Sequence, residues 1–146
     1  MAFVYDAATL EYRKTFAYPR EGWGLTTDGK SLIASDGSCF LYFMDGSFNV
    51  QRKLKVTMND RPVRYLNELE WIKGRIWANV YTTDMIVIIN PSNGKVEGTI
   101  DCTGLLPKHL RKPDTDVLNG IAVLGDRCFI TGKKWPKLFE IELIAK

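Results

Sequence analysis

The sequence predicts an all-β fold: a partial β-propeller of about three blades, preceded by two outer strands of a further blade. One pattern occurs three times, in which a small-residue opener leads into an apolar run, a turn, and two more apolar strands separated by a polar break. Counting from Gly22 to Asn67 to Asn119 gives steps of 45 and 52 residues. A repeat of about 40–50 residues with about four strands is typical of a propeller blade. Since a closed propeller needs about four to eight blades, we expect residues 1–146 to form a single truncated propeller domain.

Composition and charge limit the class of function. The chain has 146 residues, 45% of them hydrophobic, and its formal net charge is +3. Its lysines and arginines are scattered among acidic residues, which argues against a nucleic-acid partner. No apolar run approaches the ~20 residues of a membrane helix and no leader is recognisable, so no membrane partner is expected and the compartment stays open. Three separated cysteines and a lone histidine argue against a zinc or disulfide framework, and no metal or cofactor is expected.

The first elements are two N-terminal strands and one complete blade. Phe3–Tyr5 and Tyr12–Tyr18, joined by a turn, are expected to be the outer strands of an incomplete blade. The complete blade is expected from about Glu21 to Val56. Asp-Gly pairs separate its apolar runs, and such pairs supply the positive φ angles of tight hairpin turns. After its inner strand, the expected strands are Ser31–Ser35, Phe40–Met44 and Phe48–Val56.

Two further blades are expected downstream. Met58–Val63 is predicted to be a linker, and Tyr65 to start the inner strand of the second blade. Thr103–Pro113 is the one segment with roughly helical leucine spacing, and its final proline would end a helix. The last blade is predicted from about Asp116 to Leu143 with about three strands. The remaining expected strands are Arg75–Tyr81, Met85–Asn90, Lys95–Ile100, Arg127–Thr131 and Leu138–Leu143.

The repeated openers mark the candidate site, because the first strand of each propeller blade lines the central channel. Aligning the openers gives Gly22, Asn67 and Asn119 one shared position. Glu68 occupies the next position. The alternative is a purely structural role for these residues. The glycines would then allow the strands to approach closely, and the polar residues would form hydrogen bonds in a water-filled channel.

Aromatic residues near corresponding strand ends favour a binding mouth. Trp23, Tyr81 and Trp135 are suited to form a box for an amide-bearing group. Trp71 and Trp77 are instead expected to pack between blades. The segment that ends in Trp135 carries paired lysines, one of which could extend into the mouth, although a solvated loop is the competing interpretation. No phosphate loop, Ser/His/Asp set or metal-ligand spacing is recognisable.

Several segments together resemble the plant and bacterial type of glutaminyl-peptide cyclotransferase, from Phe3 to Leu143. This family is a five-bladed propeller that converts the N-terminal glutamine of peptides or proteins to pyroglutamate and releases ammonia, independently of metal. The resemblance therefore implies an acyltransferase whose partners are peptide N-termini. The segments that carry it are Glu21–Thr26, Tyr65–Trp71, Trp77–Asp84, Leu118–Ala122 and Thr131–Glu140.

The resemblance also implies roles for individual residues. Trp23 and Tyr81 correspond to aromatic walls, Asn67 to a polar anchor for the substrate, and Lys133 to a cation near the leaving group or oxyanion. Tyr81 stands where the family often has tryptophan. With their neighbours in the motifs, Asn119 and Trp135 complete the expected substrate-binding set.

One family motif, Phe-Gly-Glu-Gly-Leu, is absent from the sequence. Its glutamate is thought to act as general acid/base in the family, and a positioned carboxylate contributes about 10²–10⁴-fold to such steps. Glu68 aligns with it by repeat and is the candidate substitute. We therefore expect impaired cyclisation. The alternatives are a non-catalytic peptide-binding module and an oligomerising fragment that self-associates through open blade edges.

Overall fold

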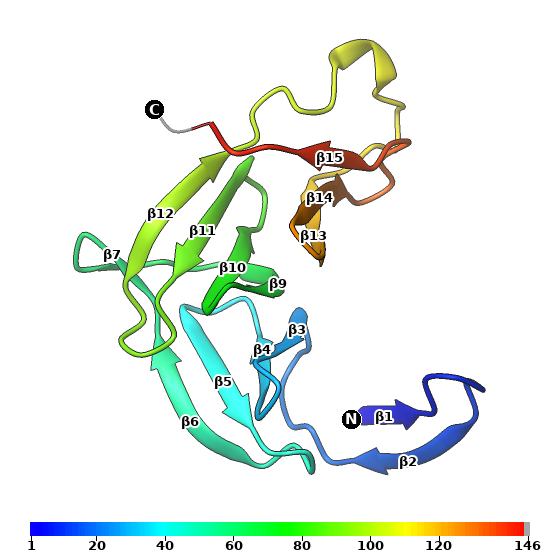
Figure 1. Cartoon of the computed structure of the whole chain (residues 1–146), viewed down its shortest axis with the longest axis vertical. Coiled ribbons are helices and arrows are strands. Elements are labelled where there is room, and N and C mark those ends of the chain that lie inside the picture. Colours follow the sequence, from blue (N-terminus) through cyan, green and yellow to red (C-terminus); the bar gives the residue numbers. More distant parts are fainter. Residues whose placement is uncertain (145–146) are drawn as a thin grey trace.

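The computed structural model describes residues 1–144 and is built almost entirely of antiparallel sheet. Three sheets radiate from a common centre and form an open arc, with β3, β9 and β13 innermost and β6 and β12 at the outer edge (Figure 1). A two-stranded hairpin, β1–β2, lies at one end of this arc. The predicted all-β, partial-propeller fold is thus confirmed. The strands are β1 (Ala2–Tyr5), β2 (Tyr12–Phe16), β3 (Gly24–Thr27), β4 (Leu32–Ser35), β5 (Phe40–Met44), β6 (Val50–Lys55), β7 (Thr57–Met58), β8 (Arg61–Pro62), β9 (Leu66–Ile72), β10 (Arg75–Val80), β11 (Met85–Ile89), β12 (Val96–Asp101), β13 (Leu118–Leu124), β14 (Arg127–Gly132) and β15 (Phe139–Ile141).

Each large sheet is one blade. The first blade has the order β3-β4-β5-β6, the second β12-β11-β10-β9, and the third β13-β14-β15. The third blade therefore has the three strands that the sequence predicts. Among the described residues, no helix is long and apolar enough to cross a membrane.

Short polar turns define the blades. The Asp28 carboxylate accepts hydrogen bonds from the backbone N–H groups of Lys30 and Ser31, at 2.9 and 2.7 Å, and closes the β3–β4 hairpin. Asp45 does the same for Ser47 and Asn49 between β5 and β6. Such Asx turns satisfy backbone donors locally, which is why these residues interrupt the apolar runs.

The hydrophobic core lies between the blades rather than inside one sheet. Since strand side chains alternate between faces, every central strand contributes to two interfaces. The first-to-second interface buries, among others, Ile33, Leu41, Val56, Leu66, Leu69, Ile76 and Val87. The second-to-third interface buries Ile72, Trp77, Ile86, Cys102, Leu118, Ile121 and Ile130. The predicted packing of Trp77 between blades, and of Trp71 against the first interface, is confirmed.

Two predicted segments differ from the structure. Met58–Val63 is not a plain linker, because β7 and β8 form a hairpin whose turn residues Asn59 and Asp60 have φ angles of 50° and 62°. Asparagine and aspartate tolerate this left-handed conformation, so the turn needs no glycine. Thr103–Pro113 contains only a 3₁₀ turn, at Lys108–Leu110, because Pro107 interrupts the segment.

Candidate active site

Neighbouring inner strands approach one another very closely around the centre of the arc. A Cβ atom added to Gly24 on β3 would lie 2.1 Å from the backbone oxygen of Asn67 on β9. The Ser35 hydroxyl donates a 2.6 Å hydrogen bond to that same oxygen. The first two blades therefore fix the start of β9, where the candidate site begins.

Three predicted site residues, one from each blade, contact one another and form what we call the mouth cluster. The rings of Trp23 and Tyr81 meet edge to face, with centroids 5.4 Å apart and an interplanar angle of 72°. The Lys133 Nζ lies 4.7 Å from the Tyr81 ring centroid. Lys133 forms no ion pair within residues 1–144. The cluster therefore offers two aromatic faces and one ammonium group without a carboxylate partner.

Backbone hydrogen bonds hold each member of the mouth cluster in place. The N–H of Trp23 donates to the Ser35 oxygen at 3.1 Å, and that of Lys133 donates to Val117 at 2.8 Å. The indole of Trp23 packs on Gly37, where a Cβ atom would lie 2.7 Å from the ring. Because these bonds continue the sheets beyond their named ends, the cluster is built on rigid structure rather than on free loops.

Asn67 lies at the start of β9, in a bulge where the β9–β10 register shifts. Only 5% of the residue is exposed. Its backbone oxygen is bound by Ser35, whereas its side-chain amide forms no hydrogen bond with another residue in the described part of the chain. An amide held this way is free to bind a ligand at both its donor and its acceptor.

Asn119 and Trp135, the other predicted binding residues, are engaged in packing the third blade. The Asn119 Oδ1 accepts the Glu68 N–H at 3.4 Å. The Trp135 Nε1–H donates to the Asp116 oxygen at 2.9 Å, and its ring meets Phe139 edge to face with centroids 6.1 Å apart. Trp135 also packs against the second inter-blade core. Their roles in binding substrate stay predictions.

Glu68 bridges the second and third blades. Its Oε2 accepts the Ile121 N–H at 2.9 Å. Burial raises the pKa of the Glu68 carboxyl to about 8, with the Glu70 charge adding to the rise and the Ile121 hydrogen bond opposing it. The residue therefore holds a proton at neutral pH. Sequence reasoning had not predicted this inter-blade contact.

Asn79 and Glu70 are two further residues of the inter-blade polar contact that sequence reasoning missed. The Asn79 side chain is fully buried, and its Oδ1 accepts the Gly120 N–H at 3.0 Å. Its Nδ2 has no hydrogen-bond partner among the described residues. The Glu70 Oε1 accepts the Val123 N–H at 3.1 Å. A polar residue inside an otherwise apolar strand, as at Asn79, was the available signal.

Glu68→Gln is expected to remove a pH dependence from folding stability. Because the folded pKa of about 8 exceeds the ordinary value of 4.5, the folded state binds this proton more tightly, and wild-type stability falls as pH rises from about 4.5 to about 8. Glutamine cannot ionise, so urea midpoints should be similar at pH 5 and higher for the variant at pH 9. Each unit of difference between the folded and unfolded pKa corresponds to about 1.4 kcal/mol. The variant should therefore exceed the wild type in free energy of unfolding by a few kcal/mol at pH 9, which urea denaturation can measure.

The control is Glu142→Gln, which removes an exposed carboxylate near the end of the described chain. Its unfolding curves should run parallel to those of the wild type across the same pH range. Parallel curves for Glu68→Gln as well would contradict the raised pKa of Glu68.

Comparisons with known proteins agree with this geometry. The model of the glutamine cyclotransferase family matches residues 1–143. The chain is 47% identical over 149 residues to a glutaminyl-peptide cyclotransferase of Arabidopsis thaliana, covering 97% of this chain and 46% of that protein. The crystal structure of Myxococcus xanthus glutaminyl cyclase superposes with a TM-score of 0.83 at 37% identity, over 90% of this chain and 59% of that chain. The chain thus spans about half the length of these relatives, and it belongs to the glutamine cyclotransferase family.

Proposed function

We propose that the chain acts in the conversion of an N-terminal glutamine to pyroglutamate with release of ammonia. The observation that carries this proposal is the mouth cluster, in which the Trp23 and Tyr81 rings meet and the Lys133 ammonium lies over the Tyr81 ring. The Asn67 amide, which has no hydrogen-bond partner among residues 1–144, follows Tyr65 by two residues, and the Tyr65 backbone oxygen accepts the Tyr81 N–H. Membership of the glutamine cyclotransferase family supports the same reaction. The substrate is a peptide or protein whose first residue is glutamine.

The reaction requires one bond to form and one to break. The neutral α-amine nitrogen attacks the carbon of the γ-carboxamide, which gives a tetrahedral intermediate with negative charge on oxygen. The C–N bond to the former amide nitrogen then breaks, and a proton lost by the attacking amine is delivered to the departing ammonia. The site must therefore orient two ends of one residue, stabilise an oxyanion and transfer a proton.

The residues of the mouth divide these tasks in our proposal. Trp23 and Tyr81, whose rings meet edge to face, form one apolar wall beside the glutamine side chain and limit water. The Asn67 amide binds the backbone of the first residue. The ammonium of Lys133 stabilises the oxyanion, because it is not neutralised by a carboxylate within residues 1–144.

Glu68 is proposed as the proton donor to the leaving nitrogen. A carboxyl with a pKa of about 8 is protonated at neutral pH and lies close to the pH at which general acids work best. Its Oε2 accepts the Ile121 N–H, which holds the carboxyl in a fixed orientation for the transfer. Glu68→Gln separates this role from a structural one, since glutamine keeps the acceptor but carries no transferable proton.

A second candidate function is peptide binding or self-association without catalysis. The specific observation is exposed apolar surface at the N-terminal end of the arc, where Phe3 and Tyr5 of β1 are 58% and 55% exposed. Leu25 on the first blade is 53% exposed. Concentration-dependent light scattering would identify an oligomer formed through this surface.

Ammonia release from a glutamine dipeptide tests the proposed function directly. We expect cyclisation at least about 10²-fold slower than by a full-length relative, because Glu68 replaces only part of the general acid/base contribution expected of the Phe-Gly-Glu-Gly motif, which is absent from the sequence. Asn67→Ala is expected to raise KM about tenfold, the effect of one lost hydrogen bond worth about 1.4 kcal/mol.

Asn93→Ala, in the turn between β11 and β12, is the matched control and should leave KM unchanged. The proposal would be contradicted if the wild-type chain released no ammonia and Asn67→Ala bound the glutamine peptide as tightly as the wild type. If the chain cyclised the peptide as fast as a full-length relative, its own carboxylates would be sufficient for general acid/base catalysis.

A further inference from the structure

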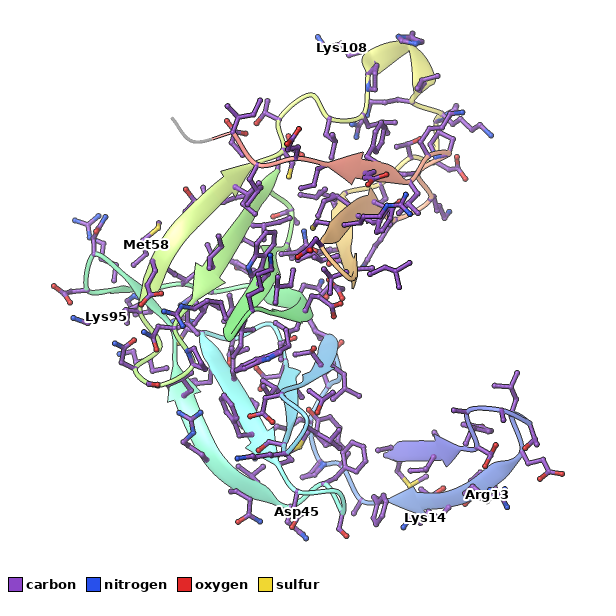
Figure 2. All side chains as sticks on the ribbon, in the orientation of Figure 1. Arg13, Lys14, Asp45, Met58, Lys95 and Lys108 are labelled. Carbon is purple, nitrogen blue, oxygen red and sulfur yellow. The ribbon has the colours of Figure 1, made fainter. Side chains whose placement is uncertain are left out.

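A groove of about 600 Å³ runs beside the mouth cluster and is not used by the proposed reaction. Its walls include Met58, Arg61, Arg64 and Tyr65 from the connection between the first two blades, and Val80 and Met85 from the second blade. Figure 2 shows Met58 at the outer edge of the arc. We call this feature the arginine groove.

The wall of the arginine groove is held at both ends. The β7–β8 hairpin is closed by Asn59 and Asp60, and the Val63 N–H then donates to the Val56 oxygen at 3.0 Å. At the inner end, the Tyr65 N–H donates to the Gly37 oxygen at 2.8 Å. A peptide bound along this wall would therefore meet a preformed surface, which lowers the entropic cost of binding.

The inner end of the groove adjoins the mouth cluster. The backbone oxygen of Tyr65 accepts the N–H of Tyr81 at 2.8 Å. Val80, which lines the groove, directly precedes Tyr81, and Asn67 follows Tyr65 by two residues. A chain that leaves the mouth past Tyr81 can thus continue along the groove.

The charged residues that line the groove are all positive. Arg61 and Arg64 are exposed, and neither guanidinium forms an ion pair or hydrogen bond with another residue of the described chain. No aspartate or glutamate is among its lining residues. Tyr65 and Met85 are also exposed, at 56% and 37%. Two free guanidinium groups beside apolar surface suit an extended segment that carries carboxylates, which arginine binds in bidentate fashion.

We propose that the arginine groove binds the residues that follow the N-terminal glutamine and selects substrates with aspartate or glutamate at these positions. This inference rests on the proposed function, because it assumes that glutamine occupies the mouth. It adds a substrate class: peptides with an acidic segment shortly after the first residue.

The test measures binding of fluorescent peptides by anisotropy, with no need for turnover. The probes are Gln-Ala-Glu-Glu-Ala-Gly and Gln-Ala-Gln-Gln-Ala-Gly, both amidated at the C-terminus so that no terminal carboxylate contributes. We expect the acidic peptide to bind about tenfold more tightly at low salt, and the preference to shrink as salt is added.

Arg61→Gln combined with Arg64→Gln should abolish this preference, while binding of the neutral peptide stays the same. Arg111→Gln is the matched control, since Arg111 is exposed and lies outside the groove. The proposal is overturned if the wild type shows no preference, if the double variant keeps it, or if Arg111→Gln reduces it equally. Circular dichroism would show that the variants are folded.

Replacing the first glutamine by alanine in both probes separates the two proposals. Loss of affinity on this replacement supports occupation of the mouth by glutamine. If the replacement leaves affinity unchanged while the preference for the acidic probe persists and still depends on Arg61 and Arg64, the groove is supported and the proposed function is contradicted. A requirement for glutamine without any charge preference contradicts the groove alone.

Discussion

Lys133→Met is expected to lower kcat/KM for cyclisation of a glutamine peptide by about 10²-fold or more. Methionine keeps most of the side-chain length and its contact with the Tyr81 ring, but it removes the ammonium group that lies 4.7 Å from that ring. Loss of a single oxyanion-stabilising donor typically costs about 10²–10³ in rate. Ammonia release under kcat/KM conditions gives the ratio directly.

The neighbouring Lys134 provides a matched control. It is exposed, and its Nζ lies 3.8 Å from the Asp114 carboxylate rather than at the mouth cluster. Lys134→Met should therefore leave kcat/KM within about twofold of the wild type, as expected for a surface ion pair of little energetic weight. Equal losses in the two variants would mean that Lys133 acts only through the overall charge of its loop.

Gly24→Ala is expected to lower the free energy of unfolding by about 3 kcal/mol, the upper range for inserting one methyl group into a tightly packed region. The added Cβ would lie 2.1 Å from the Asn67 oxygen and 2.9 Å from its carbonyl carbon. Both are backbone atoms, so a rotamer change cannot relieve the clash and β3 must move away from β9. Urea denaturation measures the loss.

Gly46→Ala is the control for this substitution. A Cβ atom at Gly46 has no heavy atom within 4 Å, so the same chemical change should alter the free energy of unfolding by less than about 0.5 kcal/mol. Because Gly24→Ala displaces Asn67, it should also weaken glutamine-peptide binding. Wild-type stability in Gly24→Ala would contradict the close approach of the first two blades.

Most strands were predictable because turn chemistry is local. Asp28 and Asp45 close their hairpins with their own carboxylates, so the sequence itself marks where strands end. The β7–β8 hairpin was missed since Asn59 and Asp60 form its turn without glycine. The expected helix at Thr103–Pro113 was wrong, because Pro107 interrupts the segment and only Lys108–Leu110 forms a 3₁₀ turn.

The candidate site was predictable only in part, because the partners of each residue come from other blades. The aromatic and cationic character of Trp23, Tyr81 and Lys133 could be interpreted from their motifs, and the structure brings these three together. The hydrogen bond from Ile121 to Glu68 joins residues 53 positions apart, which no local pattern specifies. The same holds for Asn79, whose acceptor is used by Gly120 on another blade.

The mouth cluster contains one side chain from each blade. The affinity for a ligand bound there therefore depends on how stably the three blades dock against one another. A peptide that touches Trp23, Tyr81 and Lys133 together can bind only while the blades are assembled. By mass action, a ligand at a hundred times its Kd would then add about 2.7 kcal/mol to the stability of the arc. Conversely, any fraction of molecules with one blade detached lowers the apparent affinity in proportion. A ligand that contacts all three residues would thereby stabilise the docking of the three blades.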